Sequence, residues 1–194
     1  MSTTTREQFL SVAARQFSER GFYGTSIAGI ATELGLTKQA LLHHFGSKEK
    51  LYGEILKDIS ETTLARVEAI CEQFPQPAQQ LEEIIVRHFS DQMSEPVPAR
   101  LLMRELLDNE QRAEKAGNWY LGPYLDRLID IVSSAGRVAN RAEALAVAYQ
   151  LLGAANYFAL SQPTLTQIFG KAALRDTREV FEEQLRALVR TRLA

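Results

Sequence analysis

The chain has 194 residues, of which 45% are hydrophobic and 24% are charged. A chain of this length and composition buries a substantial core in one or two compact domains, which excludes an intrinsically disordered protein. Its formal net charge of −2 excludes a bulk polycation that coats nucleic acid.

Charge distribution and cysteine content narrow the class further. Residues 1–60 carry seven Lys and Arg against six Asp and Glu, whereas residues 61–194 carry fifteen against eighteen. The basic excess is therefore local, which suits a small DNA footprint.

The single cysteine, Cys71, excludes an intramolecular disulfide. No apolar run approaches the ~20 residues that span a bilayer, and the N-terminus lacks a signal-peptide core, so we expect a cytoplasmic protein with no membrane partner.

The first predicted helix begins at Thr4 or Thr5, either of which can cap it, and ends at Arg20 and Gly21. Its apolar face consists of Phe9, Ala13 and Phe17.

Residues 25–45 are predicted to form two short helices joined by a tight turn. Thr25 or Ser26 caps the first helix, and Gly35 ends it because glycine adopts the left-handed conformation cheaply. Thr37 caps the second helix, and Ser47 caps the helix that follows. The apolar positions of the first helix are Ile27, Ile30, Ala31 and Leu34, and the inward positions of the second are Ala40, Leu41 and Phe45.

The second short helix keeps polar side chains on its outer face, where Lys38, Gln39 and His43 lie beside Leu42. Lysine and glutamine hydrogen-bond to base edges, and histidine reaches a phosphate or a base. Backbone amides at the starts of the helices can hold phosphate oxygens. Such a pair of helices is typical of a helix-turn-helix, whose second helix fits the DNA major groove.

Helices are predicted over most of the remaining chain. The first is a long helix at 48–72, about 37 Å in length. Others follow at 78–93, 99–107, 119–134, 140–161 and 173–193, with a short helical turn at 165–169 and a polar loop at 109–118. Prolines at 75, 77, 96, 98 and 163 separate them. No alternating strand pattern occurs, so the predicted fold class is all-α.

Enzymatic chemistry finds no support in the sequence. The three histidines are His43, His44 and His88, and none of them is paired with another at the i, i+4 spacing of a helical metal site. No glycine-rich phosphate loop or nucleophile elbow occurs. We therefore expect no enzyme activity, no metal and no cofactor.

Over about residues 6–60 the chain resembles the tetracycline-repressor (TetR) family of one-component transcriptional regulators. The resemblance is carried by Phe9, Ala13, Phe17, the junction at 21–26, Ile30, Ala31, residues 34–36, Leu41, residues 43–45 and residues 47–51. It implies an N-terminal three-helix helix-turn-helix domain at 1–47 and a C-terminal helical ligand-binding and dimerisation domain at 48–194. Members usually carry tyrosine where this chain has Leu42, which cannot hydrogen-bond and is expected to touch a thymine methyl group instead.

The resemblance also implies two sets of site residues. The DNA-binding set comprises phosphate contacts at Thr25, Ser26, Thr37, His43 and Lys48 and base contacts near Lys38, Gln39 and Ala40, and Leu42, where the chain departs from the family, is added to it as an apolar contact. The ligand-binding set comprises Phe89, Met93, Met103, Trp119, Tyr120, Tyr124, Tyr149, Asn156 and Phe158. His88, on an apolar face, is expected to be a hydrogen-bonded core residue.

The predicted function is a sequence-specific DNA-binding transcriptional regulator, a repressor that a small-molecule inducer releases. The resemblance implies a homodimer through the last two long helices, bound to near-palindromic duplex DNA with recognition helices about 34–36 Å or a multiple of that apart. The alternative is a helical ligand-binding or protein-interaction module without DNA binding. Salt-dependent DNA affinity separates the two, because only the first predicts it.

Overall fold

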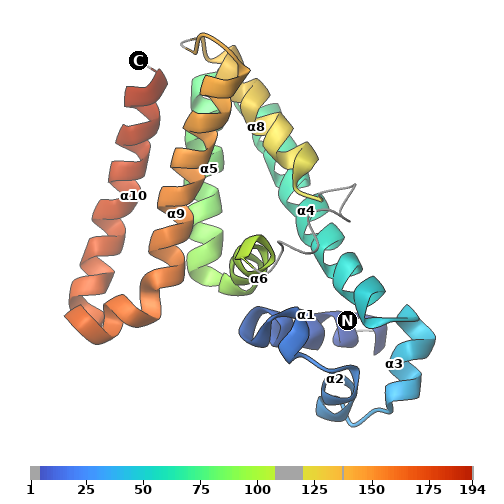
Figure 1. Ribbon diagram of the computed structural model, residues 1–194. Coiled ribbons are helices and arrows are strands. Elements are labelled where there is room, and N and C mark those ends of the chain that lie inside the picture. Colours follow the sequence, from blue (N-terminus) through green and yellow to red (C-terminus); the bar gives the residue numbers. More distant parts are fainter. Residues whose placement is uncertain (1–4, 108–119, 137, 194) are drawn as a thin grey trace. The chain divides into compact units, whose positions relative to one another are not determined.

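The computed structural model describes residues 5–107, 120–136 and 138–193, and every regular element in these ranges is an α-helix, as predicted. In chain order the helices are α1 (Thr5–Gly24), α2 (Ile27–Glu33), α3 (Lys38–Phe45), α4 (Lys48–Gln73), α5 (Pro77–Ser94), α6 (Pro96–Leu107), α8 (Gly122–Ser134), α9 (Arg141–Phe169) and α10 (Lys171–Leu193) (Figure 1).

The packing of the chain divides it into two compact units. Unit 1 comprises the described parts of residues 1–61 and 97–120, and unit 2 comprises those of 62–96 and 121–194. Helix α4 therefore contributes its first half to unit 1 and its second half to unit 2. Helix α6 belongs to unit 1 although its neighbours in sequence, α5 and α8, belong to unit 2. The functional division at residue 47 stays a prediction.

The core of unit 1 forms where α1, α2, α3, α4 and α6 bury their apolar faces. The predicted face of α1 is fully buried, Ile27, Ile30, Ala31, Leu41 and Phe45 of the short helices are buried, and Leu34 and Ala40 are partly buried. The largest fully buried side chains are Phe9, Phe17, Ile30, Leu41, Leu51 and Leu101. This burial fixes the short helices α2 and α3, which are too short to be stable alone.

Helix α6 is attached to the rest of unit 1 by polar contacts that range from buried to exposed. The Arg104 guanidinium donates to the carbonyl oxygens of Ser18 at 2.7 Å and Glu19 at 2.6 Å, near the end of α1. The Tyr52 hydroxyl of α4 donates to the buried Glu105 carboxylate at 2.7 Å. A guanidinium at a helix C-terminus satisfies carbonyl groups that have no partner within the helix.

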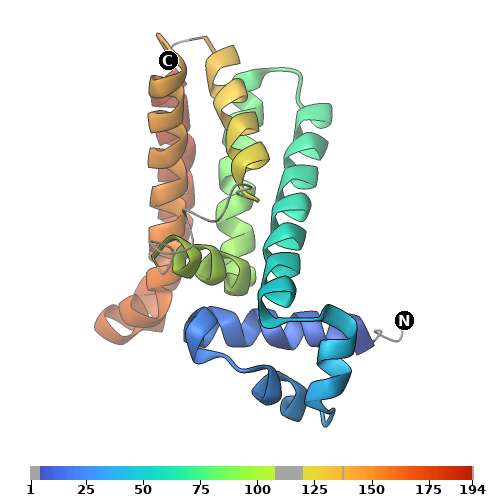
Figure 2. The ribbon, with the colours of Figure 1, turned by 45° about the vertical axis from the view of Figure 1, so that its right-hand side comes forward.

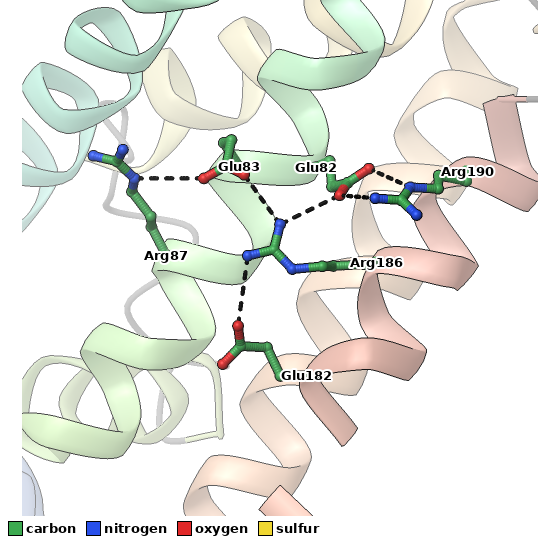
Figure 3. A network of polar contacts seen from close by, with 6 residues as sticks. All are labelled: Glu82, Glu83, Arg87, Glu182, Arg186 and Arg190. Carbon is green, nitrogen blue, oxygen red and sulfur yellow. Dashed lines mark hydrogen bonds and ion pairs between the residues drawn. The ribbon is translucent and has the colours of Figure 1, made fainter. Parts of the chain in front are cut away.

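Unit 2 is built from α5, α8, α9, α10 and the end of α4 (Figures 1 and 2). Its core includes Leu81, Ile85 and Phe89 of α5, Leu128 and Val132 of α8, and Leu151 of α9, together with Leu185 and Val189 of α10. At one end of α5, Arg186 and Arg190 of α10 bind Glu82 and Glu83, as Figure 3 shows. We call Glu82, Glu83, Arg87, Glu182, Arg186 and Arg190 the ion network.

At two predicted helix ends the structure differs from the prediction because of proline. Helix α6 begins at Pro96 rather than Ala99, because the first turn of a helix has backbone amides without partners and tolerates proline there. Helix α9 continues through Pro163 to Phe169 rather than ending near Ser161. Its last part turns aside from the main helix axis (Figures 1 and 2), the bend expected where proline removes a hydrogen bond.

Among the described residues one helix, α9, is long and apolar enough to cross a membrane by length and composition alone. Packing explains this composition. The buried residues of α9 in the core of unit 2 include Ala144, Val147, Ala148, Leu151, Leu152, Ala155 and Phe158. A core helix of this kind is apolar because it packs against several neighbours.

Candidate nucleic-acid interface and candidate ligand site

Local hydrogen bonds fix the helix α2 and the turn that follows it. The Ser26 hydroxyl accepts a hydrogen bond from the backbone amide of Gly29 at 3.0 Å, which confirms Ser26 as the N-cap. At the other end the Leu36 amide donates to the Ala31 carbonyl at 2.9 Å, and Gly35 adopts a φ of 67°. This is the Schellman arrangement, which satisfies the last carbonyls of α2 and directs the chain into α3.

Helix α3 is bounded by two further predicted caps. The Thr37 hydroxyl accepts from the Ala40 amide at 3.1 Å, and the Ser47 hydroxyl accepts from the Lys50 amide at 3.2 Å at the start of α4. Gly46, with a φ of 77°, ends α3 between them. The length and position of α3 therefore follow from residues within ten positions of it.

The two faces of α3 differ sharply in burial. Leu41 and Phe45 are buried in the core of unit 1, whereas Lys38, Gln39 and His43 are exposed. Ala40 and Leu42 are half-buried and pack against that core. The structure thus brings the polar residues predicted to contact DNA onto one accessible helix face, beside the exposed caps Ser26 and Thr37.

Thr25 differs from the other predicted DNA contacts because its side chain is buried. Its hydroxyl lies within hydrogen-bond distance of the carbonyl oxygens of Gln16, at 3.1 Å, and Gly21, at 2.9 Å. Gly21 breaks α1 with a φ of 73° and a ψ of 174°. The hydroxyl therefore ties the broken end of α1 to the start of α2. The phosphate contact of Thr25 stays a prediction, and it falls to the backbone amide because the hydroxyl is buried.

Two charged groups near α3 have defined partners in unit 1. Glu33, at the end of α2, accepts a hydrogen bond from Gln16 at 2.9 Å and pairs with Arg15. These contacts, that with Gln16 first, lower the pKa of the Glu33 carboxyl below its usual value. The Lys48 ammonium lies 4.3 Å from the centre of the Phe22 ring, a cation–π contact that restricts the position of this predicted phosphate ligand.

The structure brings only part of the predicted ligand-binding set together. Phe89 and Phe158 lie in the core of unit 2 with ring centres 5.7 Å apart, and Met93 packs against the same core. Tyr124 and Asn156 both lie beside His88. These residues come from α5, α8 and α9.

Four residues of the ligand-binding set lie elsewhere. Tyr149 is on α9 but exposed, and Met103 and Tyr120 belong to unit 1. Trp119 lies outside the residues that the structure describes. Helical spacing alone does not show which unit a segment joins, so the sequence prediction mixed residues from both.

Gln92 is a residue of this region that the sequence analysis missed. It lies one turn after His88 on α5, and its Nε2 is 2.5 Å from His88 Nε2 and 2.5 Å from Asn156 Oδ1. His88 Nε2 is also 2.9 Å from Asn156 Oδ1. The signal that the sequence contained was a second polar residue, at i+4 from His88, on an otherwise apolar face. We call His88, Gln92, Tyr124 and Asn156 the polar cluster.

Burial shifts the ionisation of two members of the polar cluster. It lowers the pKa of the His88 imidazole, because desolvation disfavours the charged form, and hydrogen bonding to Asn156 opposes this only in part. Burial also raises the pKa of the Tyr124 hydroxyl well above its usual value. Both groups are therefore uncharged at neutral pH.

Comparison with known proteins places the helix-turn-helix region in a known family. Residues 9–55 match the sequence profile of the bacterial regulatory proteins of the tetR family. The chain is 31% identical over 84 residues to the HTH-type transcriptional repressor KstR2 of Mycolicibacterium smegmatis, covering 43% of this chain and 41% of that protein. It is 35% identical over 102 residues to the HTH-type transcriptional regulator RutR of Escherichia coli, covering 53% and 48%. The match spans less than half the length of these relatives.

Solved structures resemble the chain over nearly its whole length. The transcriptional regulator FadR from Bacillus subtilis, solved in complex with stearoyl-CoA, has a TM-score of 0.71 at 18% identity and covers 92% of this chain and 96% of that one. The ketosteroid transcriptional regulator KstR2 of Mycobacterium tuberculosis has a TM-score of 0.65 at 16% identity and covers 97% and 95%. At these identities the likeness shows a shared fold.

Proposed function

Because the chain belongs, through its helix-turn-helix region, to the tetR family of bacterial regulatory proteins, we propose that it is a sequence-specific DNA-binding transcriptional regulator. The observation that carries this proposal is the exposed face of α3. Lys38, Gln39 and His43 are accessible there, while Leu41 and Phe45 hold the opposite face in the core. A single helix presented in this way fits the major groove of B-DNA.

The residues near α3 divide into two roles. Gln39 is accessible in the first turn of α3, where recognition helices contact base edges, so it reads sequence. Lys48 lies in the first turn of α4 and is held against Phe22, so it binds a phosphate whatever the base sequence. Leu42 is half-buried and offers only an apolar contact. Ala40, also half-buried, allows close approach of the helix backbone to the bases.

The regulator acts as a homodimer through α9 and α10, and the exposed apolar residues of α9 support this. Leu145, Tyr149, Gly153 and Tyr157 recur every four residues along α9, and each is exposed. Tyr157 is 79% exposed, although soluble proteins seldom leave a row of such side chains uncovered. A second copy of the chain covers this row and provides the two-fold symmetry that a near-palindromic operator requires.

The dimer is tested by Tyr157→Glu, which places a charge on the proposed contact. We expect sedimentation equilibrium to show a monomer for this variant and a dimer for the parent. Asp58→Asn, a charge change at an exposed residue of α4 in unit 1, serves as a control for general surface effects. A parent protein that is monomeric at micromolar concentration contradicts the proposed interface.

Unit 2 binds the effector, a small molecule that releases the repressor from DNA. The Bacillus subtilis FadR structure, which shares the fold, contains stearoyl-CoA, so this architecture accommodates a ligand. A ligand shifts the regulator toward its released state only by its difference in affinity for the two states. The protein acts in the cytoplasm, where its operator DNA is accessible.

The DNA-binding proposal is tested in two steps. Genomic DNA fragments retained by the purified protein are sequenced, and a near-palindromic motif is expected. Affinity for that motif is then measured against salt, where log K is expected to fall by ~0.9 per phosphate neutralised for each unit of log salt. Lys48→Ala should weaken binding to all sequences and reduce the slope by about one contact, whereas Gln39→Ala should also relax base preference.

The matched control is Lys57→Ala, which removes an exposed lysine of unit 1 outside the predicted contact set. Its affinity and salt slope should equal those of the parent. A parent protein with no salt-dependent DNA affinity favours the alternative of a ligand-binding or protein-interaction module. Equal binding by the parent, Lys48→Ala and Gln39→Ala would show that α3 is not the DNA-reading element.

A further inference from the structure

The polar cluster contains two buried polar atoms that lack partners. Gln92 is 7% exposed and Tyr124 is 4% exposed. Gln92 Oε1 and the Tyr124 hydroxyl have no hydrogen-bond partner among the described residues. A buried polar group without a partner destabilises a protein by about 1–3 kcal/mol, and such groups are uncommon in native structures. Two of them beside the same histidine therefore require an explanation.

Three further atoms of the polar cluster contact one another, and their hydrogen-bond roles are mutually incompatible. His88 Nε2, Gln92 Nε2 and Asn156 Oδ1 lie within 2.9 Å of one another in every pairing. An amide nitrogen only donates and an amide oxygen only accepts, while a neutral imidazole nitrogen does one or the other. Three such atoms in mutual contact leave one mismatched pair in every tautomer and amide orientation. The mismatched pair is either two donors or two acceptors, and it is relieved when an incoming group of the opposite kind pairs with one of the two atoms and separates them.

The surroundings of the polar cluster exclude a charged group in that position. None of its four members is a carboxylate, an ammonium or a guanidinium, and burial keeps His88 neutral. The nearest acidic residue on α5, Asp91, is exposed and pairs with Arg66 at 2.6 Å. An ion placed among apolar residues without a partner is strongly disfavoured. Phe89, which follows His88 directly in α5, and Phe158, two residues after Asn156 in α9, are part of the apolar core.

We propose that the polar cluster binds the polar group of the effector, and that this group is an uncharged alcohol or primary amide on an otherwise apolar molecule. This inference rests on the proposed function, which supplies the need for an effector. An alcohol or amide accepts a hydrogen bond from the Tyr124 hydroxyl and donates one to Gln92 Oε1. The second lone pair of its oxygen accepts a hydrogen bond from His88 Nε2–H, which separates His88 from Gln92 and removes the mismatched pair of donors.

The inference is tested on the full chain with four six-carbon probes that differ only in their polar group: 1-hexanol, hexanamide, hexanoate and hexylammonium. Binding is measured at pH 7 by the rise in Tm and by calorimetric titration, without DNA. The neutral probes should raise the Tm and the two charged probes should not. Tyr124→Phe and Gln92→Leu should each weaken hexanamide binding about tenfold, the loss of one hydrogen bond to a buried partner.

Tyr23→Phe, which removes an exposed hydroxyl from unit 1, is the matched control and should bind hexanamide as the parent does. Without any probe, Tyr124→Phe should keep or raise the Tm, because it removes an unpaired buried hydroxyl. A lower Tm for this variant, tighter binding of the charged probes, no binding of either neutral probe, or equal binding by all variants would each overturn the inference. DNA binding is measured in a separate experiment, so the proposed function can hold even where this inference fails.

Discussion

The ion network between α5 and α10 provides a quantitative test of how unit 2 is held together (Figure 3). The Glu82 side chain is 14% exposed and accepts two hydrogen bonds from Arg190, at 2.7 Å and 2.6 Å, and one from Arg186 at 3.3 Å. Glu82→Gln preserves the size of the side chain and removes its charge. It leaves Arg186 without one of its carboxylate partners.

The expected loss follows from the exposure of the partners. Hydrogen bonds to a charged group contribute about 1.5–3 kcal/mol when they are shielded from water, but Arg190 is 69% exposed and its attraction to Glu82 is weakened by solvent. We therefore expect Glu82→Gln to lower the free energy of unfolding by about 1.5 kcal/mol. For a chain of this size that corresponds to roughly 3–6 °C in Tm.

The pH dependence of this loss has a definite sign. Hydrogen bonds from Arg190, and then from Arg186, lower the pKa of the Glu82 carboxyl in the folded protein. Its contribution is therefore complete above the pKa of the unfolded chain, about 4.3, and disappears as the pH falls through the folded pKa. The stability difference between the parent and Glu82→Gln should be constant from pH 8 to pH 6 and should shrink below about pH 4.3.

Urea denaturation followed by circular dichroism at several pH values measures the difference. Glu183→Gln is the matched control, because Glu183 is exposed on α10 and has no ion pair among the described residues. It should change stability by less than about 0.5 kcal/mol. The reasoning is refuted if Glu82→Gln is no less stable than the control, or if the difference persists unchanged into acid.

Three further substitutions test local features of the structure. Gly35→Ala should destabilise the protein by about 1 kcal/mol in urea denaturation, because φ is 67° although no atom would obstruct the new methyl group; an unchanged midpoint contradicts the turn geometry. Thr25→Val should destabilise the protein by about 1–3 kcal/mol by the same measurement, since it removes the buried hydroxyl whose single proton is shared between the carbonyl oxygens of Gln16 and Gly21. In the Tyr157→Glu background, Gly153→Ala should raise the free energy of unfolding by roughly 0.5–1 kcal/mol and raise the Tm. The reason is that alanine favours the helix more than glycine does, and no atom of the subunit obstructs a methyl group at this position of α9. A lower Tm would mean that other residues of the same subunit cover Gly153.

The helix-turn-helix could be predicted from the sequence because its determinants are local. Ser26, Thr37 and Ser47 cap the helices that follow them, and Gly35 adopts the positive φ that its position requires. Each of these residues acts on backbone groups within a few positions of itself. Agreement among several such local signals therefore predicts which face of α3 is exposed, without any knowledge of tertiary contacts.

The ligand region could be predicted only in part because it depends on contacts between distant segments. Tyr124 and Asn156 were found from their residue types, but nothing in their spacing indicated that both lie beside His88. Gln92 was missed because a glutamine on a helix is usually exposed. Tyr120 was grouped with Tyr124, although the two residues belong to different units.

The attachment of α6 means that unit 1, which carries α3, is not a continuous stretch of chain. Leu101 fills the centre of the unit 1 core, and Arg104 closes the end of α1 from a position more than eighty residues away in sequence. A fragment that stops at Glu61 would lack Leu101 and Arg104 and leave part of this core uncovered, so a fragment that keeps unit 1 intact has to include α6. A fragment designed to retain unit 1 therefore has to keep the intervening segment that contains α5, or replace that segment with a linker.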